Sequence, residues 1–316
     1  MRRLNIRFAI VILMAVMALS ASPAAAAVLL GGPGSEPDPT FNGNAMQTWL
    51  QHGQSNMEIP AGTTVRTWFD KSTHGNNAAP PPLSTQRPVM VSSFGKEVVE
   101  FGGNGKRLQF QTNFNTTFDG SFTIFSLLAP NDGDPGHDSM WFGGIGSDST
   151  SRVVLNNEGS GNVLTGLYKA GGDSDNLGMP YVGDSPWPNG SQSKFTLITW
   201  EVNAGGMSHF YVDGDPTPTA SAANDAVMAN FDLGTNNSTG LGMVTGSNGE
   251  DPWPAIQNTW VGQIAEFIIY DGALGTADRE SVEDYLLGIP EPSTLTLLGV
   301  GALGLNVLSL RRRRRK

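Results

Sequence analysis

Residues 194–202, KFTLITWEV, carry the pattern that decides the fold. The stretch is rich in aromatic and β-branched residues, and a strand places alternate side chains on opposite faces. One face takes Phe195, Leu197, Thr199 and Glu201, and the other takes Thr196, Ile198, Trp200 and Val202. We therefore predict a strand that is half-buried between two sheets.

Eight further stretches have the same character and are separated by turn signals. Each is rich in β-branched, aromatic or aliphatic residues and is bounded by Gly, Asn, Asp or Ser. They are residues 97–103, 121–128, 139–146, 151–157, 162–169, 208–214, 239–244 and 260–272. The 40 Gly and 20 Pro of the chain agree with many turns. Short strands at this spacing predict an all-β protein, an antiparallel β-sandwich of jelly-roll type.

One helix is expected after the last strand, from about Thr276 to Leu287. Thr276 is a plausible N-cap, Asp278 and Glu280 stand in the first turn, and Gly288 is a stop signal. The apolar face takes Val282, Tyr285 and Leu286. We expect this short helix to close the domain.

The C-terminal residues predict a membrane anchor. Residues 294–310 carry no charge, and as a helix they would span roughly 26 Å, which is enough for a thin bilayer. The basic block at 311–316 follows directly, and such a block stays on the cytoplasmic side of a membrane. A nucleic-acid-binding arm is the alternative, although such arms are solvated and not joined to an apolar segment.

The N-terminal residues predict export. Residues 1–8 are basic, residues 9–19 are apolar, and residues 20–27 are mostly small, which is the order of a secretory signal peptide. Cleavage after Ala26 or Ala27 would start the mature chain near Val28. The alternative is an uncleaved signal anchor.

The sequence Pro290-Glu291-Pro292 stands between the predicted domain and the apolar segment. Followed by an apolar helix and a basic tail, it resembles the PEP-CTERM sorting signal of bacteria that make extracellular polysaccharide. The resemblance covers residues 290–316. It implies that an exosortase cuts the tail, that the protein is first anchored in the inner membrane with its domain in the periplasm, and that it finally reaches the cell surface or the extracellular matrix.

The segment 28–289 is strongly acidic and reads as a single domain. Three of the 19 Lys and Arg lie in residues 1–27 and six in residues 290–316, which leaves ten against 28 Asp and Glu and a net charge near −18. Such a surface repels nucleic acid and suits the binding of cations or neutral sugars. The chain has no Cys, so it holds neither a disulfide nor a thiol nucleophile.

Three stretches resemble LamG-like, concanavalin A-like jelly-roll domains. They are residues 67–110, which begin TWFDKSTHGNN, residues 195–215, FTLITWEVNAGGMSHFYVDGD, and residues 264–287, IAEFIIYDGALGTADRESVEDYLL. The resemblance covers about residues 45–288. It implies a two-sheet sandwich of the kind that binds carbohydrate.

The motif W-x-D-x-S-x-x-G-N is the first candidate site. It comprises Trp68, Asp70, Ser72, Gly75 and Asn76. A functional interpretation makes Asp70 or His74 a ligand or catalyst. The interpretation we favour is a tight turn, because Asp, Ser, Gly and Asn at these spacings make local bonds between side chain and backbone.

The stretch NDGDPGHDS, residues 131–139, is a candidate metal site. Asp132, Asp134 and Asp138 lie within seven residues and supply the oxygen ligands that Ca²⁺ prefers. No Glu falls at the twelfth position that an EF-hand loop requires. The alternative is a group of solvated loop acids. Asp173 and Asp175 form a weaker second candidate.

Two loops share a proline-flanked tryptophan. Trp187 lies in DSPWPNGSQ and Trp253 in EDPWPAIQN. An indole held by prolines is a platform on which a sugar ring can stack, so the two are candidate carbohydrate-binding residues. The alternative is that both cap the edge of the sandwich as core aromatics.

No catalytic motif is evident, so we expect no enzyme activity. Glycoside hydrolysis needs two carboxylates across a cleft. The run E-x-D-x-x-E of glucanases with the concanavalin-like sandwich is missing, and we expect the acids of ESVED, residues 280–284, on a solvated helix face. We therefore predict an exported, non-catalytic protein that binds carbohydrate or a matrix polymer. The alternatives are an inert structural matrix component and, less favoured, a polysaccharide-degrading enzyme.

Overall fold

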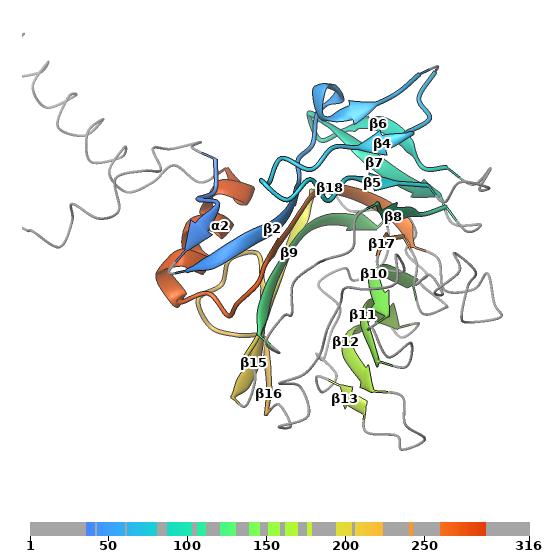
Figure 1. The fold of residues 1–316 in the computed structure, drawn as a ribbon. Helices are drawn as coiled ribbons and strands as arrows, with labels where there is room; N and C mark the ends of the chain where they lie inside the picture. The colour runs from blue at the N-terminus through green and yellow to red at the C-terminus, as the bar shows by residue number, and fades with distance from the viewer. Residues whose placement is uncertain are drawn as a thin grey trace, which may run out of the picture. The chain divides into compact units, whose positions relative to one another are not determined.

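A computed structural model describes fourteen segments of the chain, all between residues 36 and 288. They are residues 36–41, 43–60, 62–80, 87–102, 106–111, 121–130, 139–145, 151–158, 162–169, 176–178, 194–203, 206–223, 240–242 and 260–288. The chain divides into two compact units, one of Met1–Asp38 with Gly288–Lys316 and one of Pro39–Leu287. The strands and the helix α2 all belong to the second unit (Figure 1).

The first sheet has nine strands among the described residues, and we call it the helix-covered sheet. Its strand order is β1-β2-β18-β9-β14-β15-β16, and the hairpin β6–β7 pairs with β18. Its strands are β1 Thr40–Phe41, β2 Asn44–Leu50, β6 Val89–Ser93, β7 Lys96–Gly102, β9 Phe122–Pro130, β14 Thr196–Val202, β15 Met207–Val212, β16 Ala220–Ala223 and β18 Val261–Tyr270. Neighbouring strands run antiparallel.

The second sheet also has nine strands among the described residues. Its strand order is β13-β12-β11-β10-β17-β8-β5-β4-β3, again antiparallel. Its strands are β3 Met57–Glu58, β4 Thr67–Trp68, β5 Ala78–Ala79, β8 Leu108–Phe110, β10 Ser139–Ile145, β11 Ser151–Glu158, β12 Asn162–Lys169, β13 Asn176–Gly178 and β17 Gly240–Leu241. The predicted antiparallel β-sandwich is therefore confirmed.

The core between the two sheets is rich in aromatic side chains. Phe267 of β18 lies with its ring centroid 5.1 Å from that of Phe142 and 6.3 Å from that of Phe110, both on the second sheet. Trp141 meets Trp260 at 5.7 Å. Each such side chain removed from water stabilises the fold by about 1.5–3 kcal/mol. This core holds the two sheets face to face.

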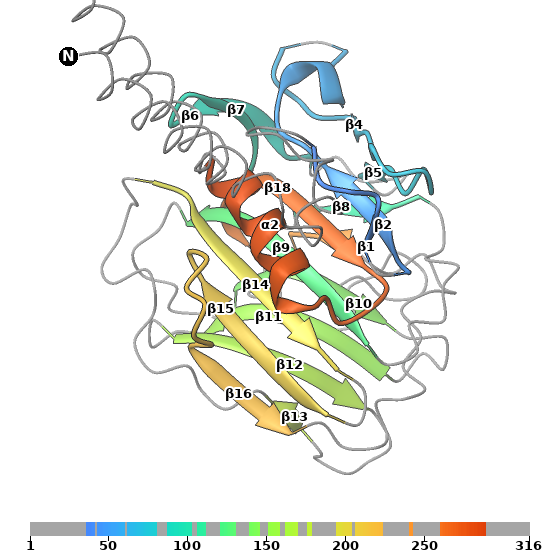
Figure 2. The same cartoon turned by 90° about the vertical axis from the view of Figure 1, so that its left-hand side faces the viewer.

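The other face of the helix-covered sheet is buried as well. Helix α2, Thr276–Leu287, lies over this face (Figure 2). Its Val282 and Leu286 belong to one buried hydrophobic cluster with Leu197 and Phe125 of the sheet. The alternation predicted for residues 194–202 is confirmed, because Ile198, Trp200 and Val202 join the core between the sheets. The expectation of a half-buried strand is wrong, because the helix covers the second face.

The predicted elements coincide with observed ones. The nine stretches correspond to β7, β9, β10, β11, β12, β14, β15, β17 and β18. Helix α2 has the predicted bounds, although Thr276 is its first residue and not the N-cap. The first helical hydrogen bond, from Arg279 N to Gly275 O at 2.9 Å, places the cap one residue earlier.

Candidate functional site

The candidate residues from the sequence fall into two groups. The tryptophans, the loop acids and the sorting motif lie outside the described residues. They are Trp187, Trp253, Asp132, Asp134, Asp138, Asp173, Asp175, Pro290, Glu291 and Pro292, together with the signal peptide 1–27 and the apolar segment 294–310. The roles of the tryptophans, the loop acids and the two terminal segments stay predictions. The motif at residues 68–76 lies within the described residues.

Two properties of the described residues bear on metal binding and membrane insertion. No group of three or more His, Cys, Asp or Glu side chains among them is placed to hold a metal ion. No helix within the described segments is both long and apolar enough to cross a bilayer.

Asp70 is the centre of a tight turn. Its carboxylate accepts hydrogen bonds from the backbone of Trp49 at 2.8 Å, of Ser72 at 2.8 Å and of Asn76 at 2.6 Å, and from the Ser72 hydroxyl at 2.6 Å. A carboxylate has about four lone-pair sites, so these four hydrogen bonds use its capacity as an acceptor. Gly75 has φ = 69°, as the turn requires. The turn interpretation is confirmed.

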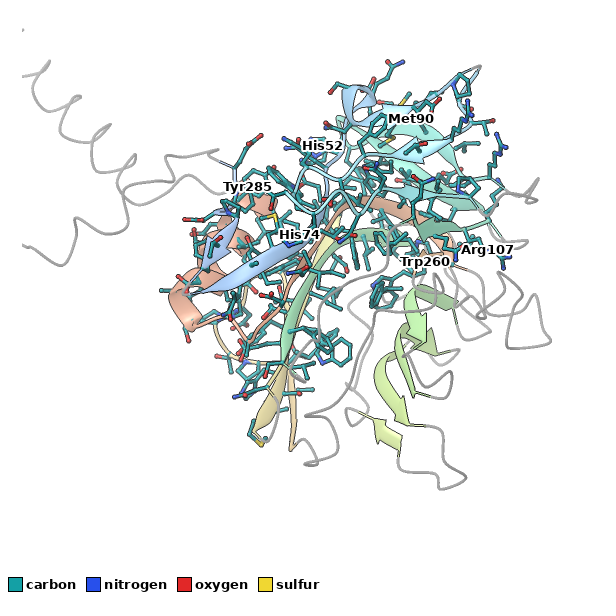
Figure 3. All side chains as sticks on the ribbon, in the orientation of Figure 1. His52, His74, Met90, Arg107, Trp260 and Tyr285 are labelled. Atoms are coloured by element: carbon teal, nitrogen blue, oxygen red, sulfur yellow. The ribbon has the colours of Figure 1, made fainter. Side chains whose placement is uncertain are left out.

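His74, the other candidate in this motif, ties the turn to a strand. Its Nδ1 lies 3.0 Å from the carbonyl oxygen of Met46 in β2, so Nδ1 donates (Figure 3). Asn76 donates to the carbonyl of Gln47 at 2.7 Å. Both contacts are to backbone, and they fix the turn against the end of the helix-covered sheet.

A group of polar residues around the end of β2 was not among the sites predicted from the sequence. We call it the Trp49 cluster, and it lies on the helix side of the helix-covered sheet. Strand β2, the turn, strand β7, strand β18 and helix α2 each contribute to it. Its members are Trp49, Gln51, His52, Lys71, Lys96, Glu266 and Tyr285.

A β-bulge aims Glu266 into this cluster. The pairing of β18 with β9 shifts register between Ile264 and Glu266. Ile264 and Phe267 both face the core between the sheets, whereas Ala265 packs on the helix side. A bulge sets two successive residues against one on the partner strand and re-aims a side chain. The carboxylate of Glu266 consequently reaches Trp49 and His52 on the helix side.

His52 joins the buried carboxylate to the surface. Glu266 is only 2% exposed, and its Oε1 lies 2.6 Å from Nδ1 of His52, whose side chain is 29% exposed. The indole N–H of Trp49 donates to the other oxygen at 3.3 Å. Lys96 Nζ lies 3.5 Å from Nε2 of His52. Because an ammonium only donates, this contact is compatible with Nε2 as acceptor and a proton on Nδ1.

Gln51 organises the other half of the cluster. Its amide nitrogen donates to the Tyr285 hydroxyl at 2.7 Å, and its amide oxygen accepts from Lys71 at 2.7 Å. Lys71 Nζ also lies 4.2 Å from the ring centroid of Trp49, a cation–π geometry. Tyr285 meets the Trp49 ring edge-on at 6.0 Å. Helix, strand and turn are thereby linked around one indole.

The sequence held one signal for this cluster. Glu266 is a lone acid in the apolar stretch QIAEFIIY, and a charge in a buried strand is expected to be paired. The partner was not recoverable, because His52 lies 214 residues earlier in the chain.

A second ionic group lies under helix α2. Arg279 and Glu283 are each 1% exposed and are joined by a 2.7 Å contact. The guanidinium lies 3.7 Å from the ring centroid of Tyr211 on β15. The expectation that all acids of residues 280–284 are solvated is wrong for Glu283, because one helical turn brings it beside Arg279 on the sheet side.

Burial changes the acidity of this group. Burial raises the pKa of the Glu283 carboxyl above its ordinary value of 4.5, although hydrogen bonding and the positive charge of Arg279 oppose the change. Burial likewise raises the pKa of Glu201 on β14, again against Arg279. Burial and the Glu201 charge raise the pKa of Tyr211. Arg279 and Glu283 thus join helix α2 to the sheet, where Tyr211 and Glu201 lie beside them.

Two solved structures are distantly similar to this chain. A sialidase from Trypanosoma rangeli in complex with sialic acid is 14% identical with a TM-score of 0.47, over 80% of this chain and 34% of the sialidase. Domain 4 of AbnA, a GH43 extracellular arabinanase from Geobacillus stearothermophilus in complex with arabinotriose, is 16% identical with a TM-score of 0.42, over 77% of this chain and 98% of that domain. The chain spans about a third of the length of the sialidase.

One of two sequence comparisons found a match. No curated protein matches the chain significantly. A family profile described as the PEP-CTERM protein-sorting motif matches residues 288–315, which include Pro290, Glu291 and Pro292. The predicted sorting motif is therefore confirmed. The chain ends in a PEP-CTERM protein-sorting motif, which implies an exported protein that is membrane-anchored until an exosortase processes it.

Proposed function

We propose that the chain is a non-catalytic protein of the cell surface or extracellular matrix, with a LamG-like, concanavalin A-like jelly roll that binds extracellular polysaccharide. The observation that carries the proposal is the Trp49 cluster. Its amide, imidazole, ammonium and phenol groups are held in place by mutual contacts, yet His52 remains 29% exposed. Fixed polar groups beside aromatic rings are what a binding site for a small polar unit such as a sugar requires.

Binding is favoured over hydrolysis by the single acid in this cluster. Glycoside hydrolysis by the usual route requires two carboxylates on opposite sides of the bond. Glu266 is the one carboxylate of the Trp49 cluster, and its two oxygens accept from His52 and Trp49. The group therefore supports recognition of a polysaccharide more readily than its cleavage.

Two loop features from the sequence belong to the same proposal. Trp187 and Trp253 are offered as stacking platforms, and Asp132, Asp134 and Asp138 as ligands of Ca²⁺. The tryptophans and the Ca²⁺ ligands are two independent ways in which the domain would bind the same polysaccharide.

Affinity electrophoresis tests the proposal. A fragment of residues 28–289, which contains the whole compact unit Pro39–Leu287, is run through gels that hold different polysaccharides, with Ca²⁺ and with EDTA. We expect at least one polymer to retard it. Retardation that EDTA abolishes would assign binding to the loop acids. Retardation that survives EDTA but is lost in Trp187→Ala and Trp253→Ala would assign it to the tryptophans. Unchanged migration in every gel would contradict the proposal and favour an inert structural component.

A further inference from the structure

Lys96, His52 and Glu266 form a line that leads from a half-buried side chain into the interior of the domain. Nζ of Lys96 on β7 lies 3.5 Å from Nε2 of His52, which follows β2. Nδ1 of His52 lies 2.6 Å from Oε1 of Glu266 on β18. The exposed fraction falls from 29% at His52 to 2% at Glu266. Three separate parts of the chain thus place an amine, an imidazole and a buried carboxylate in a row.

Glu266 fixes which nitrogen of His52 carries the proton. A carboxylate only accepts hydrogen bonds, so Nδ1 is the donor and the lone pair of Nε2 faces Lys96. The indole N–H of Trp49 donates to the second oxygen of Glu266 at 3.3 Å and keeps the carboxylate in place. An imidazole oriented in this way by an acid acts as a base toward the group at its other nitrogen. The group at Nε2 is the amine of Lys96.

The surroundings of Lys96 differ from those of an ordinary surface lysine. Lys194 is such a residue, because its side chain is 67% exposed and its ammonium pairs with the carboxylate of Asp213. Within the described segments, no carboxylate forms an ion pair with Lys96, and its side chain contacts the imidazole instead. A carboxylate stabilises the charged form of an amine, whereas a neutral imidazole accepts a proton. Lys96 therefore has a proton acceptor beside it, and Lys194 has a counter-charge.

We propose that Lys96 is a nucleophilic amine with His52 as its general base, and that it forms an imine with the aldehyde at the reducing end of a polysaccharide. A nucleophile in contact with a base that a third group orients is the arrangement of activated nucleophiles in proteins, and lysine amines form Schiff bases with carbonyl compounds. Glu266 is the positioning residue. The reactivity of the amine follows from its contact with His52, whereas the choice of a sugar aldehyde rests on the proposed function.

The step conserves atoms and charge. Nε2 of His52 takes a proton from the Lys96 ammonium, and the free electron pair of Nζ attacks the aldehyde carbon to form a C–N bond. The carbonyl oxygen becomes a hydroxyl by gaining a second proton from Nζ. His52 then gives its proton to this hydroxyl, which leaves as water while the C–N bond becomes a double bond. The products are a protonated imine and water, and the step requires no oxidant or reductant.

Reductive trapping tests the inference. The fragment of residues 28–289 is incubated with maltotriose and sodium cyanoborohydride, which reduces an imine to a stable amine, and the modified lysines are identified by peptide mass spectrometry. Because a general base contributes roughly 10²–10⁴-fold, we expect Lys96 to be modified at least about tenfold faster than Lys194. Maltotriitol, which has no aldehyde, should modify neither. A rate at Lys96 that does not exceed the rate at Lys194 would overturn the inference, because exposure alone would then decide the reaction.

Changes of His52 and Glu266 separate activation of the amine from packing. His52→Ala should lower the rate at Lys96 about tenfold and leave the rate at Lys194 unchanged, and added free imidazole should restore part of the loss. Glu266→Gln should also lower the rate at Lys96, because an amide NH₂ then replaces one of the oxygens that hold His52 and Trp49. Urea unfolding identifies the variants that are folded. Slow modification that imidazole does not restore in folded His52→Ala protein would reduce His52 to a packing role and overturn the general base.

The outcomes of trapping and of the gel experiment are separable. Retardation by a polysaccharide, together with a rate at Lys96 no faster than that at Lys194, would overturn the covalent step alone. Fast modification of Lys96 in a fragment that no polysaccharide retards would support the step and contradict the proposed function.

Discussion

Two buried glutamates lie on the helix side of the same sheet and differ in what surrounds them. Glu283 is 1% exposed and its partner Arg279 is also 1% exposed, so the pair is sealed between helix α2 and the sheet. Glu266 is 2% exposed, but its partner His52 has a side chain that is 29% exposed. The comparison teaches that burial of a charge does not by itself mark a functional site. The exposure of the partner residue distinguishes an ion pair that only holds the helix to the sheet from a site that can contact a ligand.

The largest loss of stability is expected when the buried ion pair of Arg279 and Glu283 is broken. Arg279→Met leaves the carboxylate of Glu283 buried without its counter-charge, which should lower the free energy of unfolding by about 3–5 kcal/mol. Urea unfolding of the fragment measures this. A loss below about 1 kcal/mol would show that Glu283 is solvated or protonated once the arginine is removed.

A double variant sharpens the interpretation of Arg279 as an anchor. Arg279→Met combined with Glu283→Leu replaces the pair by apolar side chains, and such replacements are often neutral or stabilising. The double variant should therefore recover most of the stability lost in the single one. Its binding of polysaccharide should be unchanged, because neither residue belongs to the Trp49 cluster.

A smaller effect on stability is expected from the other glutamate. Glu266→Gln keeps the size of the side chain, but one of the donors, His52 or Trp49, then faces an amide NH₂. We expect a loss of about 1–3 kcal/mol in urea unfolding. Unlike the double variant, this one should also weaken polysaccharide binding in protein that is fully folded, because His52 loses its fixed orientation. Unaltered affinity would remove Glu266 from the site.

The pH dependence of stability separates the two groups further. Because burial raises the pKa of Glu283 and Glu201 above 4.5, the folded protein binds protons more tightly than the unfolded chain. Their contribution to stability is therefore fully present below pH 4.5 and is lost as the pH rises through the raised pKa values. Urea unfolding between pH 4.5 and neutrality measures the slope, and Glu201→Gln should make it shallower. An unchanged slope in that variant would contradict the assignment to Glu201.

The sequence predicted the fold better than it predicted the site, for a physical reason. Alternation in KFTLITWEV and the turns around it are local signals, and they identified the sandwich and helix α2 correctly. The bulge at Ala265 is not local, because only pairing with β9 shows on which face Glu266 lies. Strand β2 was missed because its sequence NAMQTWL mixes polar and apolar residues with no clean alternation, and both Gln47 and Thr48 are buried.

The error over Glu283 has a different origin. A local signal was present, because Arg279 and Glu283 are one helical turn apart and lie next to Val282 and Leu286 on the helix surface. Acids in a terminal helix were assigned to solvent by residue type alone. The pair of opposite charges at this spacing, beside the apolar face, was the better guide.

The smallest effect on stability is expected from a change of Lys96, although its effect on binding should be clear. Lys96 is half-buried on β7, and its contact with His52 is long at 3.5 Å. Lys96→Gln should therefore change the free energy of unfolding by no more than about 0.5 kcal/mol, as is usual for such positions. A residue selected for binding is expected to show this separation, whereas a structural one loses both together. If Lys96→Gln destabilised the fragment as strongly as Glu266→Gln does, the lysine would be part of the scaffold, and the contrast between the sealed and the open glutamate would lose its functional meaning.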